Sequence, residues 1–109
     1  MSDLGKLSRD KGARAEREIV ALHAEIGILA EKVPLSGATK YQGGVDVDIY
    51  PWGSEGPPLV SEVKARASGT GFKMLEQWLG DADVLFLRRD RQKPLVVLPW
   101  STWQRLLRR

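Results

Sequence analysis

The sequence predicts an α/β protein with a central mixed β-sheet of about five strands flanked by helices, in the order α-β-β-β-α-β-β-α. The 109 residues are 42% hydrophobic and 28% charged, which is typical of one globular domain. An amphipathic segment comes first, and short apolar runs of strand length follow it, separated by Gly and Pro. One sheet covered by helices buries such runs economically. We therefore expect a single domain over residues 1–109, with residues 1–8 as a flexible N-terminal arm.

The first two-thirds of the chain predict one helix and three strands. Ser8 is the expected N-cap of the helix, and Gly27 stands where a glycine would end it. Its apolar face consists of Ala15, Ile19, Leu22 and Ile26. The three strands are expected over residues 28–33, 45–50 and 59–65. The strict alternation of VDVDIY and the turn-rich PWGSEGPP after it predict that the last two strands form an antiparallel hairpin.

The last third of the chain predicts a helix, two strands and a closing helix. The helix is expected over residues 72–80 and ends at Gly80. The strands are expected over 84–89 and 95–99, on either side of the polar loop DRQK. Ser101 is the expected N-cap of the closing helix, and its inward-facing residues are expected to be Trp103, Leu106 and Leu107.

Composition excludes several classes of site. The chain has no cysteine, so it has no disulfide, no thiolate metal site and no cysteine nucleophile. The N-terminus lacks the apolar core of a secretory signal, and no run is long enough to span a membrane, so we expect a cytoplasmic protein without membrane partners. Residues 1–17 carry a net charge of +2, residues 18–87 carry −5 and residues 88–109 carry +6. This arrangement suits bound cations in the middle and polyanions at the ends, or an ordinary mixed-charge surface.

Two carboxylates and a lysine fall on converging strands. Glu62 and Lys64 are two residues apart, so in a strand they share a face. If the hairpin register places Asp48 opposite or diagonal to Glu62, the two carboxylates repel unless one is protonated or a cation lies between them. Oxygen ligands select Mg²⁺ or Mn²⁺, and a lysine beside the ion orients or activates the attacking water. On this fragment alone, a solvated Glu62–Lys64 salt bridge on an edge strand is the alternative.

Four stretches carry a family resemblance: KGARAEREIV (11–20), VPLSG (33–37), VDI (47–49) and SEVKA (61–65). In order and approximate spacing they resemble the archaeal-type Holliday junction resolvases and their phage relatives, within the PD-(D/E)xK nuclease superfamily. That family has KG-x-x-x-ER-x-IV on its first helix, Ser-Gly in a loop, an Asp-Ile strand and then E-x-K. The C-terminal third matches only in its strand–strand–helix layout.

The resemblance implies a restriction-endonuclease-like core and a Mg²⁺-dependent, structure-specific endonuclease that resolves four-way DNA junctions by paired phosphodiester hydrolysis. The catalytic residues that it implies are Glu16, Ser36, Asp48, Glu62 and Lys64. Asp48 and Glu62 would hold the metal, with the Val63 backbone carbonyl and with Glu16 in support, and Mn²⁺ would substitute for Mg²⁺. Two matched nicks imply a homodimer, for which an apolar surface of Phe86, Leu87, Val96 and Trp100 is the expected interface.

Two of these assignments have support or rivals in the sequence. Glu16 falls between Ile19 and Val20 on a helical wheel, inside the apolar arc, where completing a metal site would explain an acid. The proline that the family has before its metal aspartate is absent, since position 47 is Val. Asp46 shares the strand face of Asp48 and is the second choice; Asp48 is preferred because it directly precedes Ile49 as in the family.

Other residues have both functional and structural interpretations. The expected DNA-binding residues are Arg9, Lys11, Arg14, Lys40, Arg66 and Lys73, although each could be a solvated charge. Ser36 suits a turn, and only the resemblance assigns it a role at the site. His23 is expected to be structural, and Trp78 and Trp103 are expected to pack in a core or dimer interface, although tryptophans also stack on bases. The alternative functions are a flap, mismatch or restriction-type nuclease of the same superfamily, or a non-catalytic DNA-binding protein.

Overall fold

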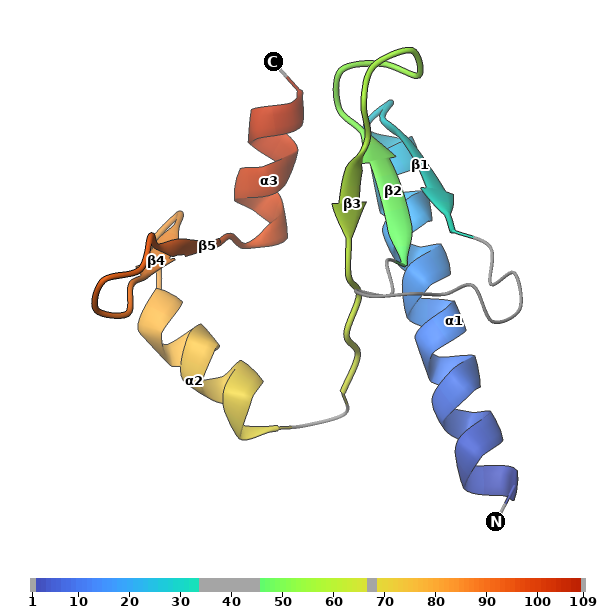
Figure 1. Cartoon of the computed structure of the whole chain (residues 1–109), viewed down its shortest axis with the longest axis horizontal. Coiled ribbons are helices and arrows are strands. Elements are labelled where there is room, and N and C mark those ends of the chain that lie inside the picture. The colour runs from blue at the N-terminus through green and yellow to red at the C-terminus, as the bar shows by residue number, and fades with distance from the viewer. Residues whose placement is uncertain (1, 34–45, 67–68, 109) are drawn as a thin grey trace. The chain divides into compact units, whose positions relative to one another are not determined.

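The computed structural model describes residues 2–33, 46–66 and 69–108 (Figure 1). The chain divides into two compact units, Met1–Ala65 and Arg66–Arg109, and each is described by itself. Within these residues, three helices and five strands follow one another in the order α-β-β-β-α-β-β-α, which confirms the predicted mixture of helices and strands and their order, while one mixed five-stranded sheet stays a prediction. The described strands form two antiparallel sheets, one of three strands and one of two. A single domain over the whole chain stays a prediction.

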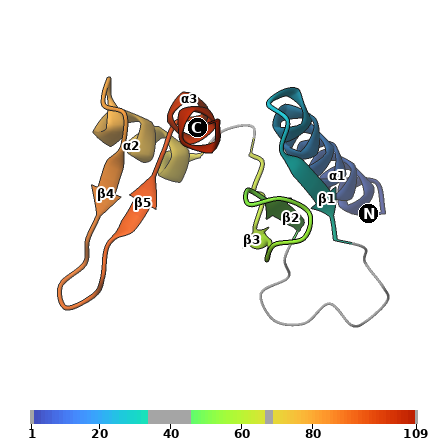
Figure 2. The same ribbon diagram turned by 90° about the horizontal axis from the view of Figure 1, so that it is seen from above.

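The first unit packs one long helix against a small sheet. Helix α1 (Ser2–Glu25) is followed by strands β1 (Leu29–Lys32), β2 (Val47–Tyr50) and β3 (Leu59–Ser61). All pairing is antiparallel, with β2 in the centre. Figures 1 and 2 show α1 running along the sheet. The face of the sheet that holds Ala30, Val47 and Ile49 is buried, so the apolar half of the alternating strand supplies the core of this unit as predicted.

Helix α1 begins earlier than the sequence indicated. The prediction that Ser8 caps the helix is wrong, because the helix starts at Ser2 and so also includes the residues for which we expected an arm. The C-terminal end of α1 follows the prediction that Gly27 terminates the helix. Gly27 has φ +76°, the Gly27 amide donates to the Ala24 carbonyl and the Ile28 amide donates to the His23 carbonyl. This pair of hydrogen bonds is the Schellman motif, in which a glycine adopts the left-handed conformation.

We expect Gly27→Ala to lower the free energy of unfolding by about 1 kcal/mol, because a Cβ is unfavourable in the left-handed region. The space around Gly27 is open, so the backbone conformation alone produces the effect. Gly12→Ala is the matched control: it lies inside α1 with equally open space and should stabilise the protein, since alanine favours a helix over glycine. Thermal unfolding should show a lower melting temperature for Gly27→Ala and a higher one for Gly12→Ala. Equal shifts of the two melting temperatures would contradict this account of the helix end.

The second unit consists of α2 (Thr70–Leu79), β4 (Leu85–Leu87), β5 (Leu95–Val97) and α3 (Trp100–Leu107). Gly80 ends α2 as predicted, and its amide donates to the Glu76 carbonyl. The prediction that Ser101 caps the last helix is wrong, because Pro99 occupies the N-cap position in an extended conformation and Ser101 already lies inside the helix.

The buried face of α3 also differs from the prediction. Leu106 was expected to face inward and is 55% exposed. Thr102 is buried instead, and its hydroxyl donates to the Asp83 carbonyl at 2.6 Å, which satisfies a polar group away from water. Arg105 forms an ion pair with Asp83 at 3.2 Å, so the residues before β4 hold α3 through two contacts.

Candidate functional site

Strand β2 positions two aspartates on the face of the sheet opposite to its buried residues. Val47 and Ile49 are buried, and side chains alternate along a strand, so Asp46 and Asp48 point away from that core. Asp48 pairs with Val60 of β3. Counting on from this pair, Glu62 is the diagonal neighbour of Asp48, one residue beyond the end of β3. The predicted antiparallel hairpin is therefore confirmed. Continued past Ser61, the same register places Asp46 opposite Glu62 and Asp48 diagonal to it, which is one of the two arrangements for which we expected a cation between the carboxylates.

Asp48 has a carboxylate oxygen that lacks a partner. Its Oδ1 is buried and makes no hydrogen bond with any described residue. A carboxylate oxygen that has lost its water and gained no donor is unfavourable. Either a proton or a cation would relieve it, and a cation fits the neighbouring Glu62, whose side chain is 46% exposed.

Asp46 has a structural role. Its Oδ2 accepts a hydrogen bond from the Val63 amide at 2.8 Å, and its own amide donates to the Ser61 carbonyl at 2.9 Å. The Ser61 hydroxyl donates to the Val47 carbonyl at 2.7 Å. Asp46 therefore fastens the end of the hairpin, whereas Asp48 has a buried oxygen with no partner among the described residues. Of the two aspartates, Asp48 is the one whose environment would be improved by a cation.

These hydrogen bonds also correct the predicted extent of the third strand. We expected it to continue to Ala65, with Glu62 and Lys64 on a strand face, but β3 ends at Ser61. The Asp46 side chain takes the Val63 amide that a regular ladder would have given to a backbone carbonyl. Glu62 and Lys64 thus lie just after the strand, on either side of the residue whose amide Asp46 binds.

Glu62 and Lys64 form an ion pair with Nζ and Oε2 3.3 Å apart. Lys64 is 61% exposed, so the pair is solvated and contributes about 0–1 kcal/mol to stability. Such a weak pair can exchange its partner for a phosphate, a water or a metal at little cost. The pair therefore fits both the surface interpretation and the catalytic one.

Glu16 has a partner that the sequence did not suggest. Its Oε1 lies 3.6 Å from Nζ of Lys32, and Glu16 is 22% exposed. Lys32 pairs with the buried Val47 across the sheet, so it belongs to the sheet face opposite to Asp48. The ion pair explains an acid in the apolar arc of α1 without a metal. The sequence contains a signal for this partner: Lys32 lies two residues after Ala30 in β1, so both side chains are on the strand face toward α1.

His23 is a packed residue, as expected. It is 1% exposed, and its Nδ1–H donates to the Ile19 carbonyl one turn earlier at 2.8 Å. Buried polar groups are normally satisfied in this way. The position suits a structural role near the end of α1.

The remaining predicted residues are placed only in part. Ser36 and Lys40 lie outside the described residues, and so does the side chain of Arg9. Lys11 is half-buried on α1 and Arg14 is exposed there, whereas Arg66 and Lys73 are exposed residues of the second unit. Trp78 is 56% exposed, so it does not pack in the core of its unit, and packing in a dimer interface stays a prediction, while Trp103 is half-buried.

Within residues 2–33, 46–66 and 69–108, no group of three or more Asp, Glu or His side chains is arranged to hold a metal. Two carboxylates are enough for Mg²⁺, which completes its shell with water and substrate phosphate. Asp48 and Glu62 would be such a pair, and the buried Oδ1 of Asp48, which has no partner among the described residues, is the feature that fits a cation.

Comparison with protein-family models, curated proteins and solved structures gives no significant match. The described helices also include none that is both long and apolar enough to cross a membrane. The motif resemblance and the chemistry of Asp48, Glu62 and Lys64 are therefore the basis for a function.

Proposed function

We propose that this protein is a divalent-metal-dependent DNA endonuclease that resolves four-way junctions by paired phosphodiester hydrolysis. The observation that carries the proposal is the buried Oδ1 of Asp48, which has no partner among the described residues. Asp48 pairs with Val60, and Glu62 and Lys64 follow two and four residues after Val60. A fold tolerates an unsatisfied carboxylate oxygen where a function requires it. The Asp…Glu-x-Lys order of these residues matches that of the PD-(D/E)xK nucleases.

Asp48 and Glu62, with the Val63 carbonyl, would hold Mg²⁺ or Mn²⁺. The Asp46 side chain accepts a hydrogen bond from the Val63 amide, which holds the chain at this residue beside β2. When bound, the ion would supply Lewis-acid polarisation of the phosphate and a lowered pKa for a bound water. Oxygen donors of this type prefer hard cations to zinc or copper.

Lys64 would orient the attacking water and stabilise negative charge that develops on the phosphate. Its ammonium lies 3.3 Å from Glu62 in a solvated pair, so it can turn to a substrate oxygen without leaving a buried charge behind. Glu16 would act in support, since its contact with Lys32 fixes α1 against β1 next to the central strand. Ser36 completes the proposed catalytic set.

The substrate class and the assembly follow from the same proposal. Basic residues of both units would contact the phosphate backbone, which supplies affinity and orientation but no sequence information. The two small sheets would combine into the five-stranded core of a restriction-endonuclease-like fold. Two such chains, related by a twofold axis, would place one active site at each of two opposed strands of a junction.

The test is cleavage of a synthetic mobile four-way junction in Mg²⁺, read on a denaturing gel with each strand labelled in turn. We expect paired nicks at symmetric positions, and much less cleavage of flap, nicked and linear duplexes. Preferred cleavage of another substrate of the panel would assign a different nuclease of the superfamily. Binding without cleavage in both Mg²⁺ and Mn²⁺ would overturn the proposal and favour a non-catalytic DNA-binding protein.

A further inference from the structure

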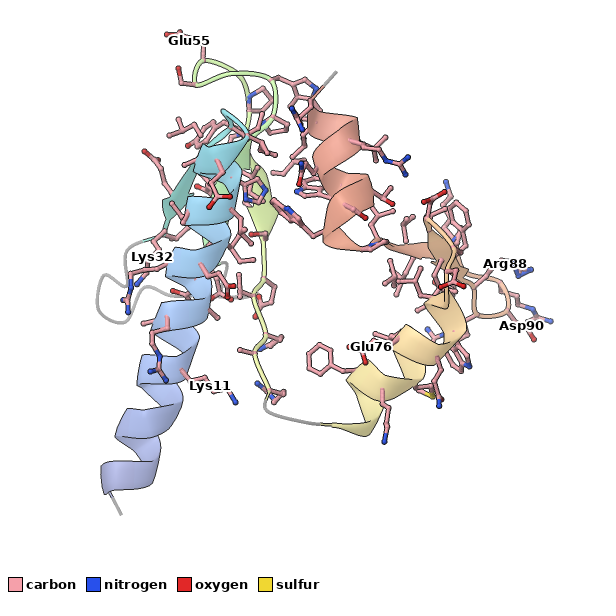
Figure 3. The ribbon with its side chains drawn as sticks, turned by 180° about the vertical axis from the view of Figure 1, so that it is seen from behind. Lys11, Lys32, Glu55, Glu76, Arg88 and Asp90 are labelled. Atoms are coloured by element: carbon pink, nitrogen blue, oxygen red, sulfur yellow. The ribbon has the colours of Figure 1, made fainter. Side chains whose placement is uncertain are left out.

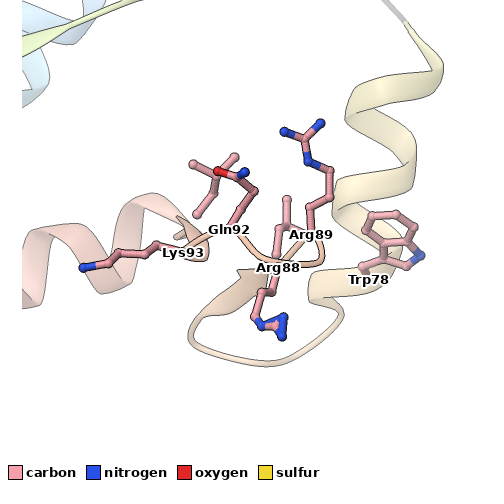
Figure 4. A pocket seen from close by; sticks show the side chains of 7 residues that line it. Trp78, Arg88, Arg89, Gln92 and Lys93 are labelled. Atoms are coloured by element: carbon pink, nitrogen blue, oxygen red, sulfur yellow. The ribbon is translucent and has the colours of Figure 1, made fainter.

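The second unit contains an open pocket of about 640 Å³ that the proposed nuclease site does not use (Figure 4). Trp78 of α2 forms one part of its lining, and Leu87 and Leu95 form another. The remaining lining residues are polar or cationic and come from the hairpin between β4 and β5: Arg88, Arg89, Gln92 and Lys93. The pocket therefore combines an apolar wall with a cationic rim inside one compact unit.

The apolar wall is open to solvent. Trp78 is 56% exposed and Leu95 is 69% exposed, and Leu95 pairs with Leu87 across the two strands. An indole that is half in water presents a flat face on which another ring can stack. Base–aromatic stacking is the way in which proteins hold single-stranded nucleic acid with little sequence preference.

The rim carries a concentrated positive charge. Residues 88–93 contain four Lys or Arg side chains and one acid, Asp90, and Figure 3 shows Arg88 and Asp90 on this hairpin. The second unit has nine basic and four acidic residues, a net charge of +5, whereas the first unit has −2. None of the ion pairs formed among the described residues involves Arg88, Arg89 or Lys93. These cations are therefore available to a ligand.

We infer that this pocket binds a nucleotide of single-stranded nucleic acid, with its base against Trp78 and its phosphates on the arginines and lysine of the rim. A guanidinium binds phosphate oxygens in a bidentate manner, and the Gln92 amide can hydrogen-bond the edge of a base. A purely apolar partner would desolvate the cations without pairing them. A small anion would leave the indole uncovered, so a ligand with both a ring and a phosphate fits the pocket best.

This binding goes beyond the proposed nuclease activity and does not depend on it. The pocket contains no carboxylate, and the proposed metal ligands belong to the other unit. Binding should therefore persist in EDTA. It should weaken with salt because counterions are released when phosphates are neutralised.

The test is fluorescence anisotropy of a labelled thymidine oligonucleotide with the full chain in EDTA. We expect Trp78→Ala to weaken binding roughly tenfold, within the range of a lost stacking contact. Arg89→Gln should weaken binding several-fold and reduce the slope of log K against log salt by about 0.7, the value for one phosphate contact on a single strand. Asp48→Asn should bind as the wild type does, which separates this result from any result on cleavage.

Two matched controls make the outcome specific. Trp52→Ala removes a tryptophan of similar exposure, 59%, from the first unit, and it should leave binding unchanged. Arg91→Gln removes a charge from the same hairpin outside the pocket lining, and it should weaken binding less than Arg89→Gln. Equal affinities of Trp78→Ala and wild type would overturn the inference. So would a change from dimer to monomer in Trp78→Ala, since a second copy of the chain would then cover the indole.

Discussion

Replacing Asp48 by Asn should reduce Mg²⁺-dependent nicking of a four-way junction at least about a thousandfold. A bound metal supplies several kcal/mol of transition-state stabilisation, and each 1.36 kcal/mol corresponds to about a tenfold change in rate. Asparagine keeps the shape of the side chain and removes the charge that holds the ion. Junction binding should change little, because basic residues rather than carboxylates supply the affinity. Single-turnover cleavage and a gel-shift assay in Ca²⁺ measure the two quantities separately.

Thermal unfolding gives a readout that needs no cleavage. Mg²⁺ at about a hundred times its Kd should stabilise the wild type by about 2.7 kcal/mol and should not stabilise Asp48→Asn. Without metal, Asp48→Asn should be at least as stable as the wild type, because a neutral amide avoids burying an unpaired charge. Glu62→Gln should lose the Mg²⁺ response and the nicking activity as well.

Asp46→Asn is the matched control for the choice between the two aspartates. Its amide oxygen can still accept the hydrogen bond from the Val63 amide, so the hairpin end should be retained. We expect this variant to keep the Mg²⁺ response and most of its activity. If Asp46→Asn loses both while Asp48→Asn keeps them, the metal ligand is Asp46. Full activity in all three variants, Asp46→Asn, Asp48→Asn and Glu62→Gln, would disprove the metal site.

The fold was predictable where local physical chemistry decides it. The alternation around Val47 and Ile49 specifies both the strand and its buried face, and Gly27 and Gly80 end helices through the backbone conformations that glycine allows. The N-termini of helices were less predictable. Ser8 and Ser101 are good capping residues in isolation, but neighbouring residues extended one helix beyond Ser8 and a proline took the cap position before Ser101.

The site was predictable only as far as the hairpin and the strand face of Asp48, which alternation places opposite to Val47 and Ile49. The register between the two strands was open in the sequence, and the structure supplies it by pairing Asp48 with Val60, two residues before Glu62. The different states of Asp46 and Asp48 depend on one hydrogen bond, between the Asp46 side chain and the Val63 amide seventeen residues away. The partner of Glu16 depends on how α1 packs against β1. Such contacts between distant segments have no periodicity in the sequence.

The apolar surface of the β4–β5 hairpin leads to the second large expected effect. Phe86 and Val96 pair across the two strands and are 63% and 55% exposed. Leu87 points to the other face of the hairpin, and both Leu87 and Trp100 are half-buried. Phe86 and Val96 are therefore the members of the expected dimer surface that are open to a partner. We expect Phe86→Asp to convert a dimer into a monomer, because it would bury a charge in an apolar contact.

Sedimentation equilibrium should show this change, and the junction assay should show its consequence. A dimer makes both nicks within one complex, whereas a monomer makes them independently, so the variant should leave singly nicked junctions where the wild type gives resolved duplexes. The substituted residue is largely solvated within a single chain, so the change should have little effect on the stability of the monomer. Leu106→Asp is the matched control, since Leu106 is 55% exposed on α3, outside the Phe86–Val96 face. Dissociation by Leu106→Asp but not by Phe86→Asp would move the interface from the hairpin to α3, and a dimer that withstands both changes would exclude both surfaces.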